Sequence, residues 1–85
     1  MNNKLEIYRK KLIYRAGYRG TKEMDILLSS FVNKYINEFD EKDLNELDKF
    51  LNFEDEEISN FYYFNIIKNG IEKNKISIIF KKFKL

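Results

Sequence analysis

The strongest helical pattern in the sequence lies at residues 24–35, which read MDILLSSFVNKY. Large apolar side chains recur there at the spacing that places them on one face of a helix. They are Met24, Leu27, Leu28, Phe31 and Tyr35. Four weaker stripes are Leu5, Tyr8, Leu12 and Ala16; Leu44, Leu47 and Leu51; Ile58, Phe61, Tyr62 and Ile66; and Ile76, Ile79, Phe80 and Phe83. The sequence therefore predicts an all-α fold, a small bundle of about five short helices.

Charged residues mark the starts of two of these helices. Asp40 is a favourable N-cap, and Asp43 falls in the first turn that follows it. The acidic run at residues 54–57 precedes the fourth stripe and suits a helix N-terminus. The last segment, residues 75–84, is rich in Ile and Phe, as a strand would be, but strict alternation fails at Ile79. Its spacing is helical, so a helix is predicted there.

Composition limits the chemistry that this chain can perform. Its 85 residues suit one helical domain, residues 1–85, and include no Cys, His, Trp or Pro. Without Cys there is no disulfide framework, and without His there is no imidazole to serve as a general base. A zinc site is disfavoured for the same reason. We therefore expect a binding protein and not an enzyme, with no catalytic residues and no metal.

The charges are segregated along the chain. Residues 1–22 carry seven basic groups and one acid, residues 38–57 carry ten acids and two lysines, and the segment from Lys68 onward carries six lysines and one acid. Such blocks form solvated faces, nucleic-acid surfaces or charged protein interfaces. Residues 1–11 lack the apolar run of a signal peptide, and no stretch is long and apolar enough to cross a bilayer. We expect a bacterial cytoplasmic protein that does not insert into membranes.

The stretch with the most functional information is residues 14–25, YRAGYRGTKEMD. Two glycines lie there between two predicted helices, beside two arginines. Gly20 can adopt a positive φ or admit another backbone at close range, and Arg19 and Glu23 would share a face if the turn is helical. The residues alone leave two interpretations open. One is an ordinary turn, and the other is a rigid recognition corner that presents a guanidinium and the carboxylates of Glu23 and Asp25.

Residues 19–25, RGTKEMD, resemble the Arg-Gly-x-x-Glu motif, with its following hydrophobic residue and Asp, of the succinate dehydrogenase FAD assembly factor family. Residues 12–16, LIYRA, resemble that family's lead-in, and residues 50–58 resemble its Leu-Leu, acidic-pair and apolar pattern. The similarity spans roughly residues 8–70. The sequence departs from the usual family pattern at Tyr18, Thr21, Glu56 and Phe61.

The resemblance implies a function. Members of the family are small helical proteins that bind the flavoprotein subunit of succinate dehydrogenase, or of related fumarate reductases, and promote covalent attachment of FAD to a histidine of that subunit. It implies a partner-binding surface made of Arg15, Arg19, Gly20, Glu23 and Asp25. Arg19 would pair with a carboxylate or carbonyls of the flavoprotein, Gly20 would permit close approach, and the two acids would accept hydrogen bonds or orient Arg19. The factor would bind no cofactor tightly, because the partner carries the FAD, and would be a monomer when free.

Two other functional classes are open to a chain of this kind. A nucleic-acid-binding or adaptor module would use the basic ends and the interleaved Tyr8, Tyr14 and Tyr18, but the acidic centre would repel phosphates. An enzyme would use a carboxylate pair such as Glu23 and Asp25, but residues two apart on a helix do not face each other. We therefore expect no nucleic-acid partner.

Overall fold

The computed structural model describes residues 3–85, except for the side chain of Asn3. Its regular elements are all helical, as predicted. In chain order they are α1 (Asn3–Gly17), α2 (Lys22–Tyr35), the 3₁₀ turn η1 (Ile36–Glu38), α3 (Glu41–Leu51), α4 (Asp55–Phe64), the 3₁₀ turn η2 (Ile71–Lys73) and α5 (Lys75–Lys82). Residues 75–82 are helical, which confirms the interpretation of the last segment.

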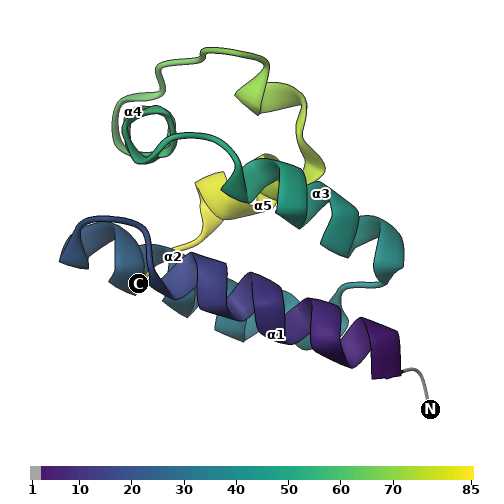
Figure 1. Ribbon diagram of the computed structural model, residues 1–85. Coiled ribbons are helices and arrows are strands. Elements are labelled where there is room, and N and C mark those ends of the chain that lie inside the picture. The colour runs from purple at the N-terminus through teal and green to yellow at the C-terminus, as the bar shows by residue number, and fades with distance from the viewer. Residues whose placement is uncertain (1–2) are drawn as a thin grey trace.

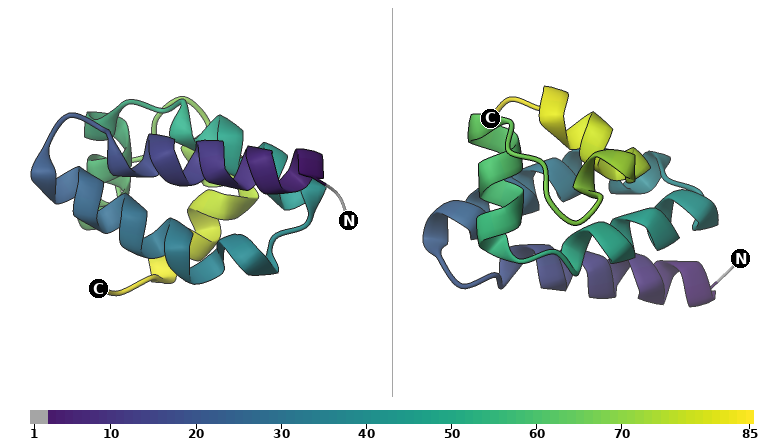
Figure 2. Two further views of the ribbon diagram at one scale, coloured as in Figure 1. Left: turned by 60° about the horizontal axis from the view of Figure 1, so that its bottom comes forward. Right: turned by 90° about the horizontal axis from the view of Figure 1, so that it is seen from above.

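The helices form a bundle around a hairpin. Helices α1 and α2 run antiparallel side by side, α3 packs on α1, and α5 packs on α3 (Figure 1). Helix α4 touches α5 and stands at the end of the molecule where α1 and α2 are joined, away from the N-terminus (Figure 2). This arrangement brings the α1–α2 loop next to the α3–α4 loop. None of the described helices is both long and apolar enough to cross a bilayer.

Aromatic rings fill the centre of the bundle. Phe31 of α2, Phe50 of α3 and Phe80 of α5 are fully buried. The ring centroid of Phe80 lies 5.1 Å from that of Phe31 and 5.2 Å from that of Phe50. Phe83 adds a further edge contact to Phe31 at 5.5 Å. Because each buried aromatic removes about 150–250 Å² from water, a few rings supply much of the core of so small a chain.

Local capping sets the helix starts. Asp40 caps α3 through its carboxylate, which accepts from the backbone N–H of Asp43 at 2.9 Å. The carboxylate of Asp43 accepts in return from the N–H of Asp40 at 3.4 Å, so the predicted cap is confirmed. The assignment of Ile66 to the fourth helical stripe is wrong. Helix α4 ends at Phe64 because Asn65 adopts the left-handed conformation, with φ of 57°.

Candidate functional site

The loop between α1 and α2 is fastened to the loop between α3 and α4 by Arg19. Its Nε donates to Oδ1 of Asp55 at 2.8 Å, its Nη1 to the carbonyl oxygen of Leu51 at 2.7 Å, and its Nη2 to that of Phe53 at 2.7 Å. Only 11% of the Arg19 side chain is exposed. The guanidinium therefore faces into its own chain.

The sequence of α3 and α4 explains why an arginine fits there. The last carbonyls of a helix have no partner within it and carry partial negative charge, and Leu51 ends α3. Asp55 is the first residue of α4. A planar guanidinium has several donors in a fixed fork, so it can satisfy a carbonyl and a carboxylate at once. Arg19 thus joins the end of α3 to the start of α4.

Gly20 and Asp25 shape the backbone around Arg19. Oδ1 of Asp25 accepts from the backbone N–H of Arg19 at 2.6 Å. Gly20 has φ of 147°, a conformation that residues with a side chain rarely adopt. A Cβ placed on Gly20 would lie 3.4 Å from Oδ2 of Asp55, an ordinary contact. The backbone conformation, more than lack of space, therefore requires glycine at this position.

Arg15 makes a second connection between α1 and α3. It forms an ion pair with Asp48, and its Nη2 donates to Oδ1 of Asn52 at 2.7 Å. The hydroxyl of Tyr8 donates to the other carboxylate oxygen of Asp48 at 3.0 Å. Burial of the phenol, together with this bond to Asp48, raises the pKa of Tyr8. Arg15, like Arg19, is engaged inside the chain.

The outer surface beside this corner is aromatic and acidic. The rings of Tyr14 and Tyr18 stack with centroids 4.4 Å apart and an interplanar angle of 23°. Their side chains are exposed, and so is Glu23 in the first turn of α2. Within residues 3–85 no ion pair involves Glu23. These groups, and not Arg19, are the exposed side chains of the corner.

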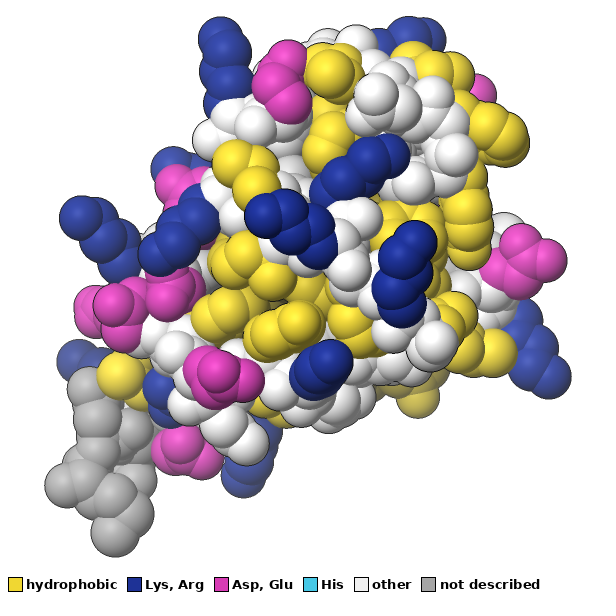
Figure 3. Space-filling model, turned by 180° about the vertical axis from the view of Figure 1, so that it is seen from behind, with side chains coloured by type: hydrophobic (Ala, Val, Ile, Leu, Met, Phe, Trp, Pro, Cys, Tyr) yellow, Lys and Arg dark blue, Asp and Glu magenta, His cyan; other side chains and the backbone are white. Residues whose placement is uncertain are grey.

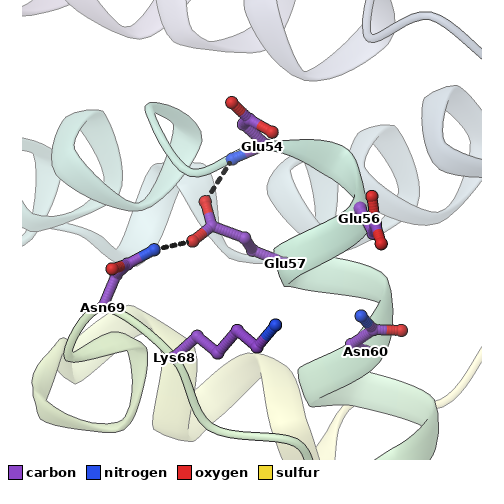
Figure 4. Close-up of a pocket in the computed structure, with 6 residues that line it drawn as sticks. All are labelled: Glu54, Glu56, Glu57, Asn60, Lys68 and Asn69. Atoms are coloured by element: carbon purple, nitrogen blue, oxygen red, sulfur yellow. Dashed lines mark hydrogen bonds between the residues drawn. The ribbon is translucent and has the colours of Figure 1, made fainter.

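A surface pocket of about 320 Å³ lies on the side of α4 (Figure 4). Its lining residues are Glu54, Glu56, Glu57, Asn60, Lys68 and Asn69. The carboxylate of Glu57 accepts from the backbone N–H of Glu54 at 3.1 Å and from the side-chain amide of Asn69. Three carboxylates against one ammonium group make this pocket electrostatically unfavourable for a phosphate group.

Comparison with known proteins identifies the family. The family model described as the flavinator of succinate dehydrogenase matches residues 10–84. The chain belongs to this family. Succinate dehydrogenase assembly factor 2, mitochondrial, of Scheffersomyces stipitis is 48% identical over 54 residues, which are 64% of this chain and 36% of that protein.

Two further relatives extend the comparison. The protein of the same name from Saccharomyces cerevisiae (strain ATCC 204508 / S288c) is 43% identical over 51 residues, 60% of this chain and 32% of that protein. The one from Caenorhabditis elegans is 32% identical over 81 residues, 95% of this chain and 68% of that protein. The match to this chain thus spans about a third of the length of the two yeast relatives.

These findings confirm the resemblance to the succinate dehydrogenase FAD assembly factor family and correct the expected location. The relatives are named as mitochondrial proteins of yeasts and a nematode, so the expectation of a bacterial cytoplasmic protein is wrong. That expectation rested on the lack of a signal-peptide pattern and of a bilayer-spanning stretch. Such a lack does not place a protein in a compartment.

The structure brings together only part of the predicted partner-binding set. Arg19, Gly20 and Asp25 meet at the corner, whereas Glu23 stands apart. The helical face shared by Arg19 and Glu23 does not form, because α2 begins at Lys22 and Arg19 precedes it. Arg19 does pair with a carboxylate and with carbonyls, but they belong to this chain. Asp25 orients Arg19 through its backbone, one of the two roles that the resemblance implied.

Reasoning from sequence missed the residues that hold the corner from the other side. Asp55 is the main one, with Asp48 and Asn52 next to it. From the sequence, Asp55 is only one of the acids at residues 54–57, which precede the fourth helical stripe. It lies 36 residues from Arg19 in the sequence. The available signal was that residues 50–58 carry four carboxylates and no basic residue, so this segment can accept an arginine from elsewhere in the chain.

Proposed function

We propose that this chain is an assembly factor that binds the flavoprotein subunit of succinate dehydrogenase, or of a fumarate reductase, and promotes covalent attachment of FAD to it. The observation that carries the proposal is the family match over residues 10–84, which includes the corner built around Arg19 and Gly20. The printed names of the relatives, succinate dehydrogenase assembly factors, support it.

The corner suggests a division of labour among its residues. Arg15, Arg19, Gly20 and Asp25 hold the two loops in one shape, because each is engaged by the chain itself or fixes its backbone. Glu23 is exposed beside them and is free to accept hydrogen bonds from the flavoprotein. A preformed surface of this kind binds with a smaller entropic loss than a mobile loop.

The chain acts without supplying a reacting group. It has no histidine to accept the flavin, and its pocket beside α4 is lined mainly by carboxylates. We therefore place the FAD on the partner, with no cofactor bound tightly here. The factor, which is not itself an enzyme, assists by holding the flavoprotein in a geometry in which FAD and its acceptor histidine react, an effect of positioning.

Replacement of the exposed acid tests the proposal. The flavoprotein subunit is co-expressed with wild-type factor or with Glu23→Lys, and its covalent flavin is measured by in-gel fluorescence. We expect the wild type to raise covalent flavin and Glu23→Lys to abolish most of that gain with an unchanged melting temperature. Glu38→Lys, which reverses an exposed acid in η1, serves as the matched control and should behave as wild type. Covalent flavin that does not depend on the wild-type factor would contradict the proposal.

A second variant examines Gly20. We expect Gly20→Arg to abolish support of flavinylation, because this glycine lies in the corner itself. Since its φ of 147° strains any other residue, the folded fraction must be measured by circular dichroism in the same preparation. Undiminished covalent flavin with Gly20→Arg would remove Gly20 from the binding surface.

The nucleic-acid alternative loses its main support in the structure. Arg9 donates to the carbonyl oxygens of Ile36 and Phe39, and Arg15 and Arg19 are bonded to α3 and α4. These three arginines of the basic N-terminal segment are thus engaged internally. A titration with DNA and RNA at two salt concentrations should give no salt-dependent binding.

A further inference from the structure

The end of α4 exposes a run of large apolar side chains. Tyr63, Phe64, Ile66 and Ile67 are 57%, 69%, 42% and 49% exposed, and we call these four residues the α4-end patch. Four such side chains within five residues form a continuous exposed apolar segment. Patches of this kind on soluble proteins mark interaction sites, because their burial against a partner is favourable.

The backbone holds the α4-end patch in one conformation. Asn65 turns the chain with a left-handed φ of 57°, and the N–H groups of Asn65 and Ile66 both donate to the carbonyl oxygen of Asn60. Further along, the side-chain amide of Asn69 donates to Glu57 on α4 (Figure 4). The loop is therefore fixed to α4 at both ends. An apolar surface fixed in this way loses little conformational freedom on binding.

Lysines at the end of α5 border the patch. The hydroxyl of Tyr62 donates to the carbonyl oxygen of Phe83 at 2.5 Å, and Nζ of Lys81 donates to that of Phe61 at 2.5 Å. These bonds place the end of α5, with the exposed Lys82, beside the end of α4. Lys68 follows the patch in the sequence, but its side chain lines the acidic pocket beside α4 (Figure 4). From the viewpoint opposite to that of Figure 1, Lys and Arg side chains stand among the hydrophobic side chains that gather on that face (Figure 3).

The charge pattern of this region determines the chemistry of its partner. From Lys73 to Leu85 the sequence contains five lysines and no acid, and Lys82 and Lys84, at and just beyond the end of α5, are exposed. A partner that covers the patch must present apolar side chains in the middle and carboxylates at the edge. A second copy of this chain does not fit, because a two-fold contact through the patch would bring lysines against lysines.

We propose that the α4-end patch docks a segment of the flavoprotein subunit in which apolar side chains are flanked by acidic ones. The inference rests on the proposed function, since it takes the same protein as the partner. The patch and the corner lie at opposite ends of α4, which has 10 residues and is therefore about 15 Å long. The flavoprotein would thus be held at two separate points, and loss of either would weaken binding.

Two patch variants and two matched controls test the proposal. One patch variant is the double substitution Phe64→Ser and Ile67→Ser, and the other reverses both Lys82 and Lys84 to Glu. The controls are Ile7→Ser, an exposed apolar residue of α1, and Lys42→Glu, an exposed lysine of α3. Binding to the purified flavoprotein subunit is measured by isothermal titration calorimetry at two salt concentrations.

We expect each patch variant to raise the Kd at least tenfold, and each control to stay within twofold of wild type. The charge-reversal variant should also weaken the salt dependence of binding, because its lysines supply the electrostatic part. All four variants should melt as wild type does, since the changed side chains are exposed. That melting comparison separates a binding defect from unfolding.

The remaining outcomes refute the inference in distinguishable ways. If wild type and patch variants bind equally well while Glu23→Lys binds poorly, the patch has no role and the proposed function stands. If wild type does not bind the flavoprotein at all, the proposed function fails and the inference fails with it. A wild-type dimer that the patch variants dissociate would assign the patch to self-association. Patch-dependent binding to phosphatidylcholine–phosphatidylserine vesicles, with flavoprotein binding unchanged, would assign it to lipid.

Discussion

Replacement of Arg19 by Ala should destabilise the fold far more than loss of a surface ion pair. An exposed i,i+4 pair, the arrangement that the sequence first suggested for Arg19, contributes only about 0.3–0.5 kcal/mol. In the structure Arg19 makes three charge-assisted hydrogen bonds and is 11% exposed. With each bond contributing about 1 kcal/mol net, the loss is about 3 kcal/mol. Chains of 85 residues are stable by only about 4–13 kcal/mol, so this loss is a large part of the total.

Urea denaturation followed by circular dichroism measures this loss directly. A change of about 3 kcal/mol corresponds to a fall in Tm of about 12–24 °C for a domain of this size. Lys22→Ala, which removes an exposed cation three residues away, is the control and should change stability by less than about 0.5 kcal/mol. A double-mutant cycle with Asp55→Ala should give a coupling energy of about 1–2 kcal/mol between Arg19 and Asp55.

The result that would refute this reasoning is a small effect. If Arg19→Ala costs less than about 1 kcal/mol and the coupling to Asp55 is near zero, the guanidinium is not held by its own chain and is available to a partner. The opposite result has a functional consequence. A variant with the full loss of stability whose folded fraction still binds the flavoprotein would show that Arg19 acts only by shaping the corner.

Three further predictions concern backbone strain, pH and packing. Gly20→Ala should lower the free energy of unfolding by about 1–3 kcal/mol, because φ of 147° is strained for alanine, and equal urea midpoints would contradict this. The ammonium of Lys75, 2.6 Å from Asp43, lowers the pKa of Asp43 below 3.8, so the pair stabilises the fold above about pH 4 and ceases to do so as the pH falls through the lowered pKa. The stability difference between wild type and Lys75→Met should therefore be present near pH 7 and absent near about pH 2, and a difference that persists in acid would show that the pair is not its source. Phe31→Ala should cost about 3–5 kcal/mol by thermal unfolding, because Phe31 is fully buried among aromatic rings, and a loss under about 1.5 kcal/mol would mean that the core closes around the gap.

The sequence alone was sufficient for the helices because their determinants are local. Apolar side chains on one face, and capping residues such as Asp40, act within a few positions of each other. Because helix determinants are local, a single residue can end a helix, and this explains the wrong assignment of Ile66. Its spacing from Tyr62 is helical, but a single left-handed residue, Asn65, ends α4 before Ile66 is reached. Asparagine tolerates that conformation without requiring it, so the pattern did not predict the break.

The residues of the corner could be predicted from the sequence, but the direction in which the Arg19 side chain points could not. The motif located the loop, its arginine and its glycine correctly in the sequence. Whether a guanidinium turns outward or inward depends on which acceptors the fold places within reach, and those of Arg19 lie 32–36 residues away, on Leu51, Phe53 and Asp55. Periodicity and propensity contain no information about contacts at that separation. From the sequence, Tyr14 and Tyr18 are only two of the aromatic residues interleaved in the basic N-terminal segment, and their exposed stack is seen only in the structure.

The large sequence separation of these contacts connects the proposed function of the corner to the stability of the whole fold. Arg19 finds its acceptors only when the α1–α2 hairpin has docked against α3 and α4, so a shaped corner exists only in the folded chain. A substitution in the aromatic core, far from any partner, then lowers the fraction of molecules that can bind once the free energy of unfolding approaches zero. An exposed substitution such as Glu23→Lys should instead lower affinity at constant stability. Plotting flavinylation support against free energy of unfolding for a set of variants should therefore place core and Arg19 variants on one curve and Glu23 variants below it. Glu23 variants that fall on the same curve would mean that this residue, too, acts through the fold.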